Sequence, residues 1–219
     1  MANLRTGTYG NYYGSFFDES ESLSASEMQT NAEYIYSSLL GSGWSENAIA
    51  AILGNMQAES SLNPGRWQSD NVGNSGSGYG LVQWTPSTNY TDWCNERGFS
   101  DPSEMDNNLA RILFEVENGL QWIATSSYNI SFKNFSTSNE SVSYLAKAFL
   151  LNYERPADQS ESVQNYRAEL ASKWFTYITG TEPSDPSDNP NYQTSKRKKY
   201  NFLLFTAKRR RSQWTRMHF

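Results

Sequence analysis

The feature that most constrains this chain is an apolar helical run that ends at a single acid. Ser45 is a favoured helix N-cap residue, and the stretch ENAIAAILGNMQAES follows it over residues 46–60. Successive helical residues turn by about 100°, so the apolar side chains from Ile49 to Met56 share one stripe and Glu59 falls at its edge. Ser, Asn, Pro and Gly then end the helical pattern. The chain therefore places a carboxyl group at the margin of its core.

A carboxyl group in that position is expected to have shifted acid–base properties. Partial burial disfavours the ionised form, and the negative potential of a helix C-terminus acts in the same direction. Both effects raise the pKa of Glu59, which is what a general acid working near neutral pH needs. The plainer interpretation is a surface acid that happens to end a helix. Position alone does not decide between these two interpretations.

Other helical patterns fill most of the chain from residue 24 onward. Ser24 and Glu27 form a capping box ahead of a helix that ends at Gly41 or Gly43. A further helix begins at Asn139 or Ser141. The remaining helices are expected at about residues 90–97, 103–122 and 162–178, and the last one stops at Gly180.

Two segments between these helices are expected to be loops. Residues 61–87 are rich in Gly, Asn and Ser, and predict a loop with at most short strands. Residues 125–139 are polar and aromatic, and predict a second loop. The predicted fold class is therefore mostly α, with five or six helices around one Gly/Asn/Ser-rich region.

Composition and charge divide the chain into four parts. Residues 1–23 predict a flexible N-terminal arm, 24–179 a helical domain, 180–195 a Pro/Ser/Asp linker, and 196–219 a basic tail. The tail has nine Lys or Arg and no acid. The first 195 residues carry nine basic and 23 acidic residues, a net charge of −14. The body and the tail are therefore expected to act as separate units.

The residue types present argue against several classes of protein. The chain has one cysteine, Cys94, which is expected to be a small buried side chain, and one histidine, His218. These are too few residues to form a usual zinc site, and they make a catalytic pair of a nucleophile and a histidine improbable. We expect no metal and no cofactor. A mean hydropathy of −0.72 and the lack of a long apolar run argue against a membrane span. The N-terminal residues have no apolar signal-peptide core, so we expect no signal peptide and synthesis in the cytoplasm.

Three separated motifs then resemble one family. ESSLNP at residues 59–64, GSGYGLVQWTP at 76–86 and NYERPA at 152–157 occur in the order and spacing of the phage tail lysozyme family. That family belongs to the lysozyme-like superfamily of goose-type lysozymes and lytic transglycosylases. The resemblance covers roughly residues 28–178 and implies an α+β lysozyme-like fold.

The resemblance also implies an activity and a place of action. It implies a phage tail enzyme, carried at the tail tip of the virion, that cleaves the β-1,4 bond between N-acetylmuramic acid and N-acetylglucosamine in the host cell wall. The catalytic acid of the family falls on Glu59. The expected partners are peptidoglycan glycan strands and other phage tail proteins, with no specific nucleic acid.

Four other residues of these motifs are candidate substrate-binding residues. Gln83 and Trp84 suit sugar hydroxyls and ring faces, although YGLVQW also alternates like a half-buried strand and Trp84 fits a core position equally. Asn63 and Tyr79 are expected to contact the substrate as well, Asn63 while shaping the turn at Pro64.

The third motif adds Tyr153, because the superfamily often places a tyrosine facing the catalytic glutamate. Beside it, Glu154 and Arg155 are expected to form a structural ion pair.

A second catalytic carboxylate is less clear from the sequence. Two acids at fixed separation serve most glycosidases, and Asp70, in the loop after Glu59, is a candidate for positioning a water molecule. Asp70 is equally well explained as a loop acid that caps a turn. With Glu59 alone, the substrate's own 6-hydroxyl would close an anhydro ring, as in lytic transglycosylases. The sequence leaves hydrolysis and transglycosylation open.

Other functions also fit the sequence. One is a non-catalytic cell-wall-binding or structural tail protein with the same fold, and another is a lytic domain of a bacterial conjugation or wall-remodelling machine. The basic tail at 196–219 suits adhesion to anionic wall polymers, but it is equally well explained as a solvated extension.

Overall fold

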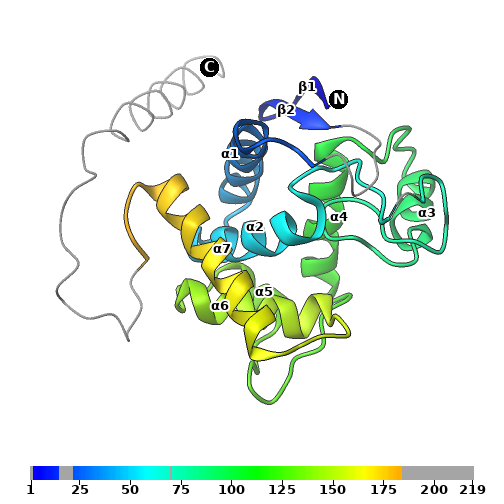
Figure 1. Ribbon diagram of the computed structural model, residues 1–219. Helices are drawn as coiled ribbons and strands as arrows, with labels where there is room; N and C mark the ends of the chain where they lie inside the picture. The colour runs from blue at the N-terminus through cyan, green and yellow to red at the C-terminus, as the bar shows by residue number, and fades with distance from the viewer. Residues whose placement is uncertain (1, 15–21, 70, 184–219) are drawn as a thin grey trace, which may run out of the picture.

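The computed structural model describes residues 2–14, 22–69 and 71–183. At its centre lies helix α2 (Glu46–Ser60), with α7 (Glu161–Thr179) and α6 (Val142–Phe149) packed against it (Figure 1). Every residue of α2 from Ala48 to Met56 is buried. A helix that is buried on all sides is the core of its domain, so α2 is more deeply enclosed than a one-sided apolar stripe predicts.

The backbones of α2 and α7 come unusually close together at Gly54. A Cβ atom built on Gly54 would lie 2.5 Å from the backbone nitrogen of Ala171. Only glycine leaves room for that approach. This contact sets how the end of α2 meets α7, and therefore what stands next to Glu59.

The N-terminal residues form a β-hairpin, so the predicted flexible arm is wrong for residues 3–14. Strand β1 (Asn3–Gly7) pairs antiparallel with β2 (Gly10–Gly14), and β2 packs on α1 (Ala25–Gly41). The Asn31 side chain on α1 holds this strand, since its Oδ1 accepts from Tyr13 N at 2.6 Å and its Nδ2 donates to Tyr13 O at 2.7 Å. These contacts join distant parts of the sequence, so no local pattern reveals them.

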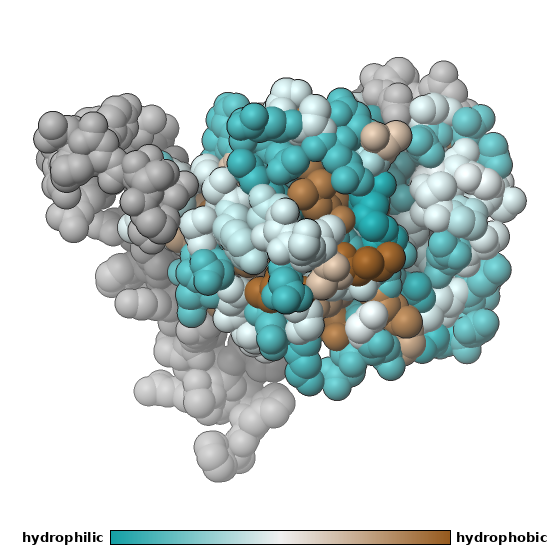
Figure 2. Space-filling view, turned by 90° about the horizontal axis from the view of Figure 1, so that it is seen from below, coloured by the Kyte–Doolittle hydropathy of each residue, from teal (hydrophilic) through white to brown (hydrophobic). Residues whose placement is uncertain are grey.

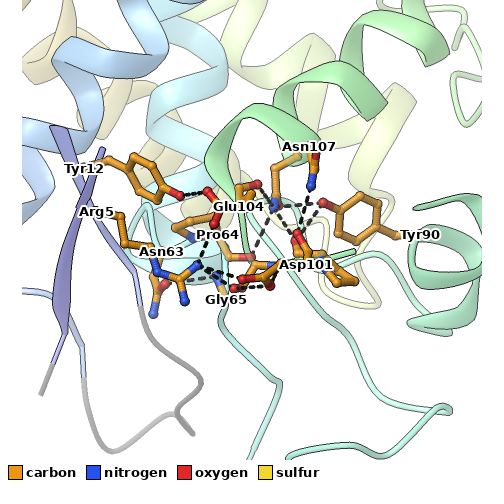
Figure 3. Close-up of polar contacts among 12 residues, drawn as sticks. Arg5, Tyr12, Asn63, Pro64, Gly65, Tyr90, Asp101, Glu104 and Asn107 are labelled. Atoms are coloured by element: carbon orange, nitrogen blue, oxygen red, sulfur yellow. Dashed lines mark hydrogen bonds and ion pairs between the residues drawn. The ribbon is translucent and has the colours of Figure 1, made fainter. Parts of the chain in front are cut away.

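The hairpin is also joined to the start of α4 (Met105–Asn118). Arg5 Nη1 donates to Ser103 Oγ at 2.7 Å and lies 3.3 Å from Asp101, while the Tyr12 hydroxyl donates to Glu104 (Figure 3). These contacts join the N-terminal residues to the helical body of the chain.

The remaining helices follow the predicted pattern with one addition. α1 begins with the complete capping box of Ser24 and Glu27, α2 with Ser45, and α7 ends at Gly180 in the left-handed conformation. α3 spans Thr88–Glu96, and a π-helical turn, η1 (Leu150–Glu154), continues α6. The addition is α5 (Phe132–Ser136), inside the predicted second loop.

Helix α5 shows how the loop prediction failed. Ser131 caps it by accepting from Asn134 N at 3.1 Å, and both Phe132 and Phe135 are buried. A capping serine followed by two aromatic residues three positions apart is a helix signal, although the polar residues around it suggested a loop.

The face of the molecule shown in Figure 2 is largely polar. On the face shown in Figure 2, apolar residues form a small group near the centre, surrounded by hydrophilic ones. Among the described residues, no helix combines the length and the apolar character needed to cross a membrane. Over the described residues the fold is mostly helical, as the sequence predicts, and its one small sheet is the N-terminal hairpin.

Candidate active site

A cleft of about 410 Å³ opens where the end of α2, the segment after it and the end of η1 meet. Four of the predicted site residues lie together in its wall. The lining comprises Ala58, Glu59, Gln68, Val82, Gln83, Trp84, Thr85, Gln121, Tyr153, Glu154, Arg155 and Pro156. The structure therefore joins in one cleft three motifs that lie far apart in the sequence.

Glu59 lies in the last turn of α2, with its side chain 21% exposed. Arg167 on α7 donates from Nη2 to Glu59 Oε1 at 2.6 Å, and from Nη1 to the Asn55 carbonyl at 2.9 Å. The predicted half-buried position of Glu59 is confirmed. The arginine beside it is a contact that the sequence analysis missed.

Glu154 brings a second carboxyl group to the same cleft. Its Oε1 is buried and has no hydrogen-bond partner among the described residues. Burial, and next the negative charge of Glu59, raise the pKa of Glu154 well above its ordinary range. The sequence analysis named this residue only as half of an ion pair.

The predicted ion pair between Glu154 and Arg155 is wrong. Arg155 adopts the left-handed conformation, with φ of 48°, and its Nη1 donates to the carbonyls of Gln121 at 2.5 Å and Asn152 at 2.7 Å. The arginine thus holds two backbone segments together. Adjacent charges in a sequence form a pair only when the backbone turns both side chains to the same side.

Gln83 is held rigidly in the cleft wall by its own turn. Its backbone is left-handed, with φ of 52°, and its Nε2 donates to Gly80 O at 2.8 Å and to Arg66 O at 3.2 Å. The turn depends on Gly80, which has φ of 85° and a close approach to the Trp84 ring. Local backbone geometry thus fixes the side chain of Gln83 within the cleft.

Trp84 and Tyr153 share one buried anchor, Glu115 on α4. Trp84 Nε1 donates to Glu115 Oε1 at 3.0 Å, and the Tyr153 hydroxyl donates to Oε2 at 2.5 Å. Arg111 Nε also donates to Oε1, at 2.8 Å. Burial raises the pKa of Glu115, and the hydrogen bond from Tyr153 is the largest opposing effect. Glu115 is not part of the cleft lining, but it fixes the positions of Trp84 and Tyr153, which are.

The contacts of Trp84 and Tyr153 refine both predictions. Trp84 is only 3% exposed and stacks on Tyr90 at 4.4 Å between ring centroids, so it belongs to the core and to the cleft wall at once. Tyr153 lines the cleft as predicted, but its hydroxyl donates to Glu115 and not to Glu59.

Two predicted site residues lie outside the cleft lining. Asn63 is fully buried, and its Oδ1 accepts from Gly65 N at 3.0 Å, which shapes the turn after α2 (Figure 3). Tyr79 is 1% exposed and packs on Trp67 with ring centroids 4.4 Å apart. Both side chains thus have structural roles, and their contact with substrate stays a prediction. Asp70 and the basic tail at 196–219 lie outside the described residues.

Arg167 and Glu115, which the sequence analysis missed, do leave a signal in the sequence. Arg167 lies at helical spacing with Leu170, Ala171 and Trp174, all buried, and Glu115 lies next to Val116 on the apolar face of α4. A charged residue on an apolar face needs a buried partner. Such residues point to an interior ionic network even when no motif contains them.

The chemistry available in the cleft is that of carboxyl groups. Within the described ranges, no cluster of three or more His, Cys, Asp or Glu side chains could hold a metal ion. Cys94 is buried and free. Two carboxyl groups, one arginine and fixed amide and aromatic side chains suit proton transfer to and from a bound substrate.

Comparison with known proteins identifies the family of the chain. The family model of phage tail lysozymes matches residues 30–178. The chain is also similar to Morphogenesis protein 1 of Bacillus phage B103, with 46% identity over 165 residues. That match covers 75% of this chain and 44% of the relative, so the chain spans less than half of the relative's length. The chain belongs to the phage tail lysozyme family.

Proposed function

We propose that the chain is a peptidoglycan-degrading glycosidase of a phage tail, with Glu59 as general acid. It cleaves the β-1,4 bond between N-acetylmuramic acid and N-acetylglucosamine and opens the host cell wall as the phage enters. The observation that carries the proposal is that Glu59 shares one cleft with Gln83, Trp84 and Tyr153, the residues of the three family motifs.

In this mechanism the carboxyl group of Glu59 donates a proton to the glycosidic oxygen. The leaving sugar departs as an alcohol, and positive charge develops at the anomeric carbon of the other sugar. Either a water molecule or the substrate's 6-hydroxyl then attacks that carbon and gives up a proton. The first outcome is hydrolysis and the second is transglycosylation.

The cleft has the size and surface that a glycan chain needs. Its volume of about 410 Å³ falls within the usual range of binding pockets. Trp84 offers part of an aromatic ring, and Gln68, Gln83 and Gln121 contribute amide side chains. Amides suit sugar hydroxyl groups, and an aromatic ring suits the C–H face of a sugar.

The similarity to a phage morphogenesis protein supports a place in the virion. We place the chain at the tail tip, in contact with other tail proteins. Peptidoglycan is its substrate, and the basic residues 196–219 add adhesion to anionic wall polymers.

Mass spectrometry of the fragments released from purified peptidoglycan tests this function. The proposal predicts fragments cut at N-acetylmuramic acid, ending either in a reducing sugar or in a 1,6-anhydro sugar. The first end group identifies hydrolysis and the second transglycosylation. Wall binding without any released fragment would contradict the proposal and favour a non-catalytic wall-binding protein.

A further inference from the structure

The two carboxyl groups of the cleft have different surroundings. Glu59 reaches the cleft from α2 and has a hydrogen-bonded cation, Arg167. Glu154 reaches it from η1, and its buried Oε1 has no hydrogen-bond partner among the described residues. The surroundings of Glu59 therefore favour a charged carboxylate, and those of Glu154 favour a neutral carboxyl group.

The cations around Glu154 offset this difference only in part, because the charges of Arg167 and Arg155 lower its pKa by less than burial and the acids raise it. Arg167 from α7 donates to Glu59 and to the Asn55 carbonyl, and Arg155 donates to two backbone carbonyls. From α4 comes a third acid, Glu115, whose charge also opposes ionisation of Glu154. The hydrogen bonds described for the two arginines thus go to Glu59 and to backbone carbonyls, and not to Glu154.

An ionised carboxyl group in that position would be costly. Desolvation of a carboxyl oxygen that has no bonded partner disfavours the charged form, and in Glu154 this effect exceeds the opposing charges of Arg167 and Arg155. The nearby charge of Glu59 adds repulsion, since two close carboxyl groups do not readily ionise together. Glu154 is therefore expected to keep its proton to higher pH than an ordinary glutamate would.

We propose that Glu154 is a second carboxyl group of the reaction centre, which holds a proton in the free enzyme and shares it with Glu59. The proposal rests on the proposed glycosidase function and adds the source of the proton. In the reaction the pair gives this proton to the glycosidic oxygen as the C–O bond breaks. The attacking water or 6-hydroxyl then returns one proton to the pair. Protons balance over one turnover, and the pair is restored.

The pH dependence of glycan cleavage by Glu154→Gln tests this sharing. Glutamine has nearly the same shape but no charge, so the repulsion that retains the shared proton is lost. We expect the alkaline limb of the kcat/KM profile to move to lower pH by about one unit or more. Glu96→Gln, an exposed change at the end of α3, is the matched control and should leave the profile in place.

A merely structural role for Glu154 gives a different result. Activity would then fall by the same factor at every pH, and the limb would stay where it is. That outcome would overturn the proposal.

A second measurement needs neither activity nor a change at position 154. Infrared titration detects the C=O stretch of neutral carboxylic acids. In the wild type we expect such a band to persist above the ordinary pKa range of glutamate, with a midpoint that falls in Glu59→Gln. The change removes a negative charge and frees Arg167. The band of Glu115, which has its own raised pKa, should stay, since no charge of Glu59 acts on it among the causes of its shift.

The two experiments separate the possible failures. If no carboxylic acid band moves in Glu59→Gln, the shared proton is contradicted, whatever the activity. If the wild type releases no glycan fragments while the band moves as expected, the shared proton stands and the proposed function fails.

Discussion

Arg167 and Glu59 stand 108 positions apart in the sequence, yet their side chains meet at 2.6 Å between Nη2 and Oε1. The same guanidinium donates to the Asn55 carbonyl, one turn earlier on α2. Arg167 therefore holds the end of α2 and the side chain of the proposed general acid together. The position of Glu59 depends on helix α7 as much as on α2.

We expect Arg167→Gln to lower both stability and wall-lytic activity. The change leaves the Asn55 carbonyl and the Glu59 carboxyl group without their donor. Because the ion pair is partly exposed, we expect a loss of about 2 kcal/mol in the free energy of unfolding, less than for a fully buried pair. Urea unfolding measures it, with Arg167→Lys expected to be intermediate. Equal stability of Arg167→Gln and wild type would show that the contact contributes nothing.

We expect Gly54→Ala to push α2 and α7 apart. The added Cβ atom would lie 2.5 Å from a backbone nitrogen of α7, which cannot move without shifting the helix. The expected cost is about 1–3 kcal/mol in thermal or urea unfolding. Gly41→Ala is the control, because its Cβ atom would meet only the Tyr9 ring at 3.9 Å. If both variants unfold alike, the close approach of the helices is not a constraint.

The stability of the chain is expected to fall as pH rises above the ordinary glutamate value of 4.5. Glu115 and Glu154 both have a raised pKa in the folded chain. Over the window up to those raised values, the folded state binds more protons than the unfolded state, so raising the pH favours unfolding. Asp158 has the opposite effect on stability at acidic pH. Hydrogen bonds from Ser160 lower its pKa, so the stability that they contribute is lost as the pH falls below the ordinary aspartate pKa of 3.8.

The melting temperature as a function of pH measures this effect. Glu154→Gln cannot ionise and should therefore show a smaller decline than the wild type over the same window. If the melting temperature of both proteins declined equally, Glu154 would not contribute to the pH dependence of stability.

We expect removal of residues 196–219 to act on whole walls only. If the tail binds anionic polymers, the shortened chain should keep its turnover on soluble glycan fragments and lose activity on walls that carry such polymers. Salt should inhibit the full-length chain and spare the shortened one, because exposed charges are screened within about 8–10 Å. Identical salt curves on walls would contradict the adhesion role.

Local chemistry in the sequence predicts the helices well. The capping box of Ser24 and Glu27, the N-cap Ser45 and the final Gly180 all stand where the structure ends or begins a helix. Each of these signals depends on backbone groups within a few residues, so the sequence contains all that is needed. The hairpin at residues 3–14 was missed because its stabilising contacts reach α1 and the start of α4.

The candidate site could likewise be predicted only in part from the sequence. Glu59, Gln83, Trp84 and Tyr153 were found through motifs, and the structure brings them into one cleft. Their partners were missed, because Glu115 lies on another helix and in no motif. The hydrogen bond from Tyr153 to Glu115 was missed for the same reason.

The central claim, that Glu59 is the general acid, is tested most directly by the turnover of Glu59→Gln on purified peptidoglycan. Glutamine keeps the shape and can still face Arg167, so the fold should survive, as circular dichroism and melting temperature would show. We predict a loss of at least about two orders of magnitude in the rate of fragment release, the usual contribution of a general acid. Glu96→Gln should match the wild type. A well-folded Glu59→Gln protein that releases fragments at a near-normal rate would contradict the account.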